Sequence, residues 1–161
     1  MLDARADRNV ARMAILAIRR AASWAHLALG LLIGAGVFVQ VYLIGAYIFG
    51  AGAVALDAHR TVGFTVHGFE VLILVAALVA WLPRADVVLS LLMAVGGTVQ
   101  LALSGAEKWT GALHPLGALF ILVLAAAIVR RDVERRRARV EASPLARRAS
   151  GDASTPSPRA A

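Results

Sequence analysis

An otherwise apolar segment, residues 58 to 70 (AHRTVGFTVHGFE), contains two histidines and a glutamate. In an α-helix, Gly63, His67 and Glu70 would lie within roughly 80° of His59 around the axis, and Glu70 would lie roughly 16 Å along it. These residues would therefore share one face. Ionisable residues inside a membrane are costly and usually line a site, a proton path or the interior of a bundle. This face is the first candidate for function.

A second histidine has similar surroundings. The sequence VQVYLIGA (39–46) precedes His59, and VQLALSGA (99–106) precedes His114. Each copy has the order Gln, Gly-Ala, a short segment, His and then Gly. The members are Gln40, Gly45, Ala46, His59 and Gly63 in the first copy, and Gln100, Gly105, Ala106, His114 and Gly117 in the second. This order predicts an internal repeat of two helical hairpins.

Four apolar stretches are long enough to position these residues in a membrane. The chain is 60% hydrophobic and 17% charged, with a mean hydropathy of +0.73, whereas soluble domains are about half apolar and a quarter charged. A membrane-spanning helix takes about 20 apolar residues. Pro83 should end the second span because proline cannot continue the helix. The predicted spans are 24–49, 61–82, 87–106 and 111–129.

The distribution of basic residues predicts the orientation of these spans. Arginines gather near the N-terminus, in the second loop and after the fourth span, whereas the first and third loops hold only Arg60 and Lys108. Both termini are therefore predicted to be cytoplasmic, in a multi-pass protein of a bacterial inner membrane.

Three domains are expected. Residues 1–21 form a basic N-terminal segment, which either lies on the membrane surface or extends the first span. Residues 22–130 form the four-helix transmembrane domain. Residues 131–161 are rich in Ala, Ser, Pro and Arg, which predicts a disordered, basic cytoplasmic tail.

The predicted fold is all-α: an integral membrane, up-down four-helix bundle built from two helical-hairpin repeats. With short loops, consecutive helices are neighbours, so the second and fourth spans lie diagonally across the core. His59 and His114 stand at the outer ends of these two spans. They are therefore expected to face each other.

Two neutral imidazoles that face each other across a bundle suit the two axial positions of a haem iron. Gly63 and Gly117 would leave room for the porphyrin, and Arg60 would pair with a propionate. The remaining polar residues are expected to surround this site or to form a proton path: Gln40, His67, Glu70 and Gln100.

Each of these residues also has a purely structural explanation. His59 would be an ordinary interfacial histidine, and His114 would simply begin a helix. His67 would be satisfied by a hydrogen bond inside the bundle, and Glu70 by being uncharged. His26 is expected at the inner membrane interface.

The motifs HRTVG (59–63), VQVYLIGA, VQLALSGA and LHPLG (113–117) resemble one four-helix half of the haem A synthase family, over about residues 37–130. They are also similar to small, uncharacterised actinobacterial four-helix membrane proteins. The resemblance implies haem b held by His59 and His114 near the outer face. Haem A synthases have two such halves, and many carry paired outer-loop cysteines. This chain has one half and no cysteine, so the resemblance implies haem binding and not the synthase reaction.

Three classes of function follow. The first is a small b-type cytochrome-like protein that passes electrons from a quinol or a membrane redox partner. The second is a non-catalytic accessory or scaffold protein with a structural polar network, and the third is a proton- or solute-conducting bundle. The chain has no phosphate loop, nucleophile elbow or metalloprotease motif, so we do not expect a stand-alone enzyme. The expected partner is the lipid bilayer and not nucleic acid, with a homo-oligomer left open.

Overall fold

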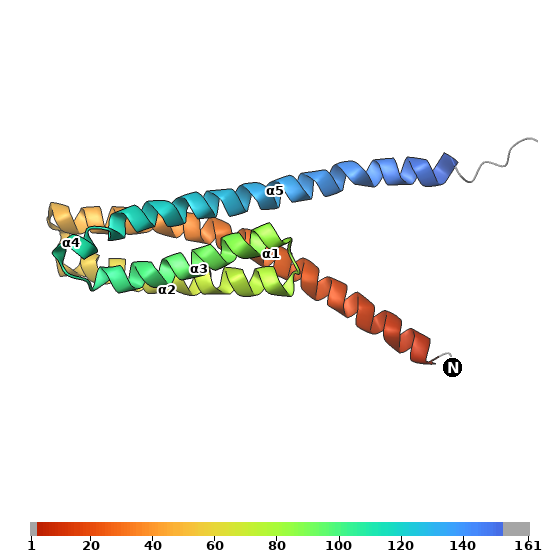
Figure 1. Cartoon of the computed structure of the whole chain (residues 1–161), viewed down its shortest axis with the longest axis horizontal. Coiled ribbons are helices and arrows are strands. Elements are labelled where there is room, and N and C mark those ends of the chain that lie inside the picture. Colours follow the sequence, from red (N-terminus) through yellow and green to blue (C-terminus); the bar gives the residue numbers. More distant parts are fainter. Residues whose placement is uncertain (1–2, 153–161) are drawn as a thin grey trace, which may run out of the picture. The chain divides into compact units, whose positions relative to one another are not determined.

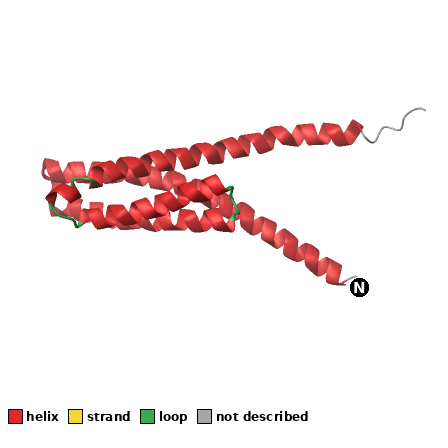
Figure 2. Ribbon diagram, viewed as in Figure 1, coloured by secondary structure: helices red, strands yellow, loops and turns green. Residues whose placement is uncertain are grey.

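The computed structural model describes residues 3–152, and the side chains of residues 6–142. Every regular element in this part of the chain is helical, as Figure 2 shows. In chain order the elements are α1 (Asp3–Ala46), the π-helical turn η1 (Tyr47–Ala51), α2 (Ala53–Val79), α3 (Arg84–Ser104), α4 (Lys108–Gly111) and α5 (His114–Asp152). The prediction of an all-α fold is confirmed.

Four of these helices are long and apolar enough to cross a membrane. They cover Ala6–Ala51, Ala53–Val79, Arg84–Ser104 and Lys108–Ala142. Helix α2 packs between α1 and α3, and the first part of α5 runs beside them (Figure 1). The prediction of a four-helix bundle is therefore confirmed, and its four candidate spans indicate a multi-pass membrane protein.

The turn between α1 and α2 is shorter than the sequence suggested. Gly50 and Gly52 have φ values of 99° and 74°, a backbone conformation that glycine adopts without strain. Helix α2 begins directly afterwards at Ala53, whereas the second span was expected from residue 61. The intervening residues AVALDAHR are mostly good helix formers. His59 consequently lies within α2, in its second turn.

The turn between α2 and α3 fixes the opposite end of the bundle. The N–H of Leu82 donates to the carbonyl of Ala77, and the N–H of Trp81 donates to that of Leu78. This is the Schellman pattern, which satisfies the last carbonyls of a helix. Trp81 takes the left-handed position usually given to glycine, with φ of 53°. Arg19 of α1 covers it, with its guanidinium 5.1 Å from the centre of the indole ring.

The core of the bundle lies on one stripe of each helix. Its buried members are Ile33, Val37, Val66, Ile73, Met93, Ile121, Leu124, Ala125 and Ile128. Glycines let the helices approach at corresponding places in the two halves. A Cβ at Gly36 would collide with Val66, and a Cβ at Gly96 would lie 3.0 Å from Ile121. Close helix contacts of this kind are typical of membrane bundles.

Helix α1 is continuous through residues 10–20. Of the two alternatives for this segment, the structure therefore has the one in which it extends the first span. The chain divides into two compact units, residues 1–129 and 130–161; the domain limits 1–21, 22–130 and 131–161 remain predictions.

In its described part the tail differs from the expected disorder, because α5 continues as a helix to Asp152. The helical part of the tail, residues 131–152, is rich in Arg and Ala, which favour helix. Ion pairs one turn apart add to this: Arg130 with Glu134, and Arg135 with Asp132. Residues 153–161 lie outside the described residues.

Candidate functional site

His59 is held from the neighbouring helix. Its Nδ1 lies 3.1 Å from the backbone carbonyl oxygen of Gln40, which belongs to α1. A carbonyl oxygen can only accept, so Nδ1 carries the proton and donates. The other ring nitrogen, Nε2, then has the lone pair that a metal ion or a hydrogen-bond donor requires.

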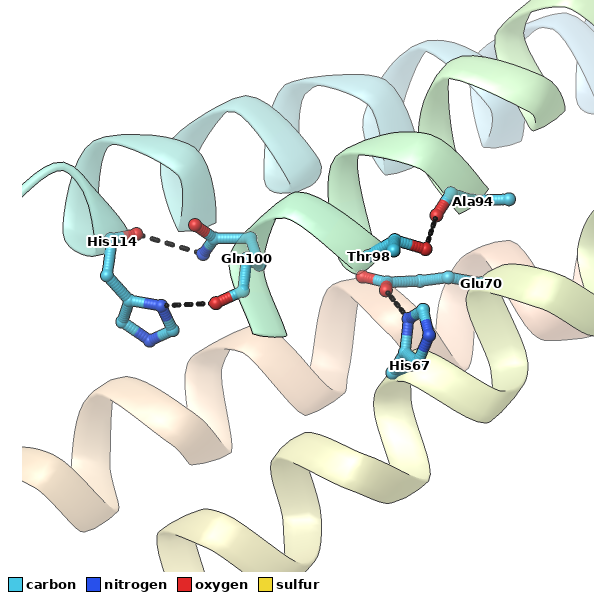
Figure 3. A network of polar contacts seen from close by, with 6 residues as sticks. All are labelled: His67, Glu70, Ala94, Thr98, Gln100 and His114. Atoms are coloured by element: carbon cyan, nitrogen blue, oxygen red, sulfur yellow. Dashed lines mark hydrogen bonds and ion pairs between the residues drawn. The ribbon is translucent and has the colours of Figure 1, made fainter. Parts of the chain in front are cut away.

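His114 is held in the same way. Its Nδ1 donates to the backbone carbonyl of Gln100 on α3, again at 3.1 Å. In addition, the side-chain Nε2 of Gln100 donates to the backbone carbonyl of His114 at 2.9 Å. Figure 3 shows these two hydrogen bonds side by side between α3 and the start of α5. Each histidine is therefore bound to the glutamine that precedes it in its own hairpin.

The two imidazoles face each other, as the sequence predicted. Their ring centroids are 6.3 Å apart and their planes meet at 70°. An ion bonded at about 2 Å to the Nε2 atoms of two opposed imidazoles would hold their centroids roughly 6 Å apart. The separation of the two centroids falls in this range. No group of three or more His, Cys, Asp or Glu that could hold a metal occurs among the described residues.

Gly63 and Gly117 were expected to leave room for a porphyrin. In the structure the space beside them is filled by the side chains of Gln40 and Gln100. A Cβ at Gly63 would lie 2.6 Å from Nε2 of Gln40, and a Cβ at Gly117 would collide with Oε1 of Gln100. The Oε1 atoms of both glutamines are buried and have no hydrogen-bond partner. Each half of the site therefore holds one unsatisfied acceptor beside its glycine, which is where a donor group of a ligand would be stabilised.

Arg60 lies apart from this arrangement. It forms an ion pair with Asp57 at 3.2 Å, and the two side chains are 64% and 70% exposed. Exposed pairs of this kind contribute little to stability. Its guanidinium is therefore free to exchange Asp57 for another anion without much cost.

His67 and Glu70 form a separate pair deeper in the bundle. His67 Nδ1 lies 3.2 Å from Oε2 of Glu70 (Figure 3). The Glu70 side chain is only 5% exposed. It fills the space beside Gly97 on α3, where a Cβ would collide with its carboxyl group. We call this space the Gly97 notch.

Sequence reasoning missed a buried polar contact at the other end of the bundle. His26 is 1% exposed, not interfacial, and its Nε2 lies 2.9 Å from Oγ of Ser90. The Ser90 hydroxyl donates to the backbone carbonyl of Asp86, so His26 Nε2 donates to Oγ. The signal was present as spacing: His26 lies 14 residues, close to four helical turns, before Gln40, so both fall on one side of α1.

Comparisons with known proteins gave no match: not in a scan against protein-family models, not among curated proteins and not among solved structures.

Proposed function

We propose that this chain is a small b-type cytochrome-like protein of the bacterial inner membrane, which binds one haem b between His59 and His114. The observation that carries the proposal is the opposed pair of imidazoles at 6.3 Å, each with Nδ1 bound to a backbone carbonyl. When one ring nitrogen binds a metal, a hydrogen bond from the other ring nitrogen fixes the orientation of the imidazole and raises its basicity. Because both histidines make the same hydrogen bond, they are suited to bind one iron from opposite sides.

Arg60 would serve the same group, because it is exposed enough to leave Asp57 for a haem propionate. Haem with two histidine ligands exchanges single electrons and has no open iron position. The proposed role is electron transfer from a quinol or membrane redox partner, in a chain that is not a stand-alone enzyme.

The proposed topology places this site on the outer side of the membrane, with both termini cytoplasmic. The support is the excess of arginine before α1, between α2 and α3, and after the fourth span. The two hairpins are proposed to be copies of one unit. The support is that both bind the histidine to the glutamine of the same hairpin and use a glycine at Gly36 or Gly96 for close packing.

An absorption spectrum of the protein purified in detergent tests the proposal. The wild type should show a Soret band that shifts on reduction, and His59→Ala and His114→Ala should each lose most of it. His26→Gln, which changes a buried histidine at the other end of the bundle, should keep the band. A wild-type protein that stays colourless after haem is supplied would refute haem binding.

A second candidate is a structural accessory protein. The two reciprocal hydrogen bonds between Gln100 and His114 would clamp α3 to α5 without any ligand. In that case His59→Ala and His114→Ala would lower the unfolding temperature, and the spectrum would be featureless for every variant.

A further inference from the structure

Glu70 is a buried acid with one hydrogen-bonding neighbour. Within the described part of the chain its hydrogen-bonding partner is His67, one turn before it on the same helix. The core residues of the other helices lie in the segments 27–46 of α1, 87–104 of α3 and 115–129 of α5. They contain no Asp, Glu, Lys, Arg or His, and their single titratable residue is Tyr42, which is 72% exposed. None of these three segments therefore supplies a cation to offset a negative charge on Glu70.

The bundle nevertheless provides space for the Glu70 side chain, because residue 97 is a glycine. Its equivalent in the second hairpin is Ala125, because both lie eleven residues after the histidine of their hairpin. The equivalent of Gly97 in the first hairpin is Val37, since both lie three residues before the glutamine. Glu70 in contact with Gly97 thus corresponds to the pair Ala125 and Val37, so one pair joins a large acid to glycine and the other a small residue to valine. Only the position beside Gly97 has space for a carboxyl group; the corresponding position carries the side chain of Val37.

The Gly97 notch is close to the histidine site. Gly97 precedes Gln100 by three residues, which is about 4.5 Å along α3, and the backbone carbonyl of Gln100 binds His114. Figure 3 shows the His67–Glu70 pair of α2 and the Gln100–His114 pair in one view. In an apolar interior, charges at a given distance interact more strongly than they would in water.

From this arrangement we propose that His67 and Glu70 bind the proton that balances the charge of an electron entering the His59–His114 site. The inference rests on the proposed haem. With ferric haem bound, the iron–porphyrin core would carry one net positive charge, and the Glu70 carboxylate, 3.2 Å from His67 Nδ1, would carry the matching negative charge. When a quinol donates one electron and releases its own proton to water, the positive charge of the core is lost, and the negative charge of Glu70 stays unmatched unless one proton enters the bundle.

The proton comes from water at the membrane surface and forms an O–H bond at Oε2 of Glu70, shared with Nδ1 of His67. On reoxidation the same bond breaks and the proton leaves. The site and the pair together stay neutral in both states. Because reduction takes up a proton, a lower pH favours the reduced form.

A redox titration at several pH values tests this coupling. In the wild type, if reduction takes up one proton, raising the pH by one unit should lower the ratio of reduced to oxidised protein about tenfold at a fixed potential. Glu70→Gln has almost the same size but cannot bind the proton, so the ratio should become independent of pH. Glu70→Asp keeps a carboxyl group and should keep the dependence. Glu107→Gln, in an exposed position, is the matched control and should behave as the wild type.

Infrared difference spectra between the reduced and oxidised protein give a second readout. A protonated carboxyl band should appear on reduction in the wild type and in Glu107→Gln, and be absent in Glu70→Gln. If Glu70→Gln binds haem and keeps the pH dependence of the wild type, the inference is overturned while the proposed function stands. A wild type without haem overturns both.

Discussion

The side-chain oxygen of Gln100 occupies the position that a Cβ at residue 117 would need. The same glutamine binds His114 twice, through its backbone carbonyl and through its side-chain nitrogen. The glycine therefore does more than allow close packing of two helices. It lets one side chain reach across and fix the histidine at the start of α5.

Gly117→Ala should consequently weaken the bundle at this point. The added methyl group must displace Gln100, which breaks its hydrogen bond to the His114 carbonyl, at a cost of about 1–3 kcal/mol of unfolding free energy. The control is Gly68→Ala, where a Cβ would meet nothing within 4 Å and where alanine should be neutral or stabilise the helix by up to about 1 kcal/mol. Denaturant unfolding in detergent micelles measures both. Equal stabilities for the two variants would show that Gln100 does not need the space at Gly117.

The Gly97 notch gives a prediction about two positions at once. Gly97→Val alone should destabilise the protein by about 1–3 kcal/mol, because the new side chain collides with Glu70. Combined with Glu70→Ala, it gives the residue types of the corresponding pair, Val37 and Ala125. The double variant should therefore recover most of the loss, with a coupling energy of about 1–3 kcal/mol between the two sites. Additive effects in the double-mutant cycle would contradict the equivalence of the two halves.

Replacing Ser90 should lower the stability of the bundle by more than the loss of one small side chain would. Ser90→Ala removes the acceptor of His26 Nε2, and a buried donor without a partner costs about 1–3 kcal/mol. The matched control is Ser104→Ala, whose hydroxyl is exposed and binds only a carbonyl of its own helix. It should change stability by less than about 0.5 kcal/mol. Thermal unfolding of both variants in the same detergent tests the difference.

The opposed histidines could be predicted from the sequence because two constraints act on them together. The repeat of Gln, Gly-Ala, His and Gly assigns His59 and His114 to corresponding places, and short loops force the helices that carry them to opposite corners of the bundle. Helix type and number follow from the length and hydrophobicity of the spans for similar reasons.

Side-chain partners could not be predicted in this way. The sequence gives no distance between Gly97 and Glu70, since their contact depends on how far α2 and α3 are shifted along one another. The burial of His26 depends equally on the register of α1 against α3. The predicted start of the second span was also wrong. A longer loop was expected there, but the chain turns at Gly50 and Gly52 and α2 begins at Ala53.

The orientation of the bundle can be tested with introduced cysteines, because the chain contains none of its own. Thr110, in α4, and Ala85, at the start of α3, are exposed and lie in opposite connections of the bundle. With both termini cytoplasmic, a membrane-impermeant maleimide should label Thr110→Cys in intact cells and label Ala85→Cys only after the membrane is opened. Leu72→Cys, exposed on the side of α2, should face hydrocarbon and resist labelling in both conditions, because the thiolate that reacts does not form away from water. Labelling of Ala85→Cys in intact cells would reverse the topology and place the two histidines on the cytoplasmic side.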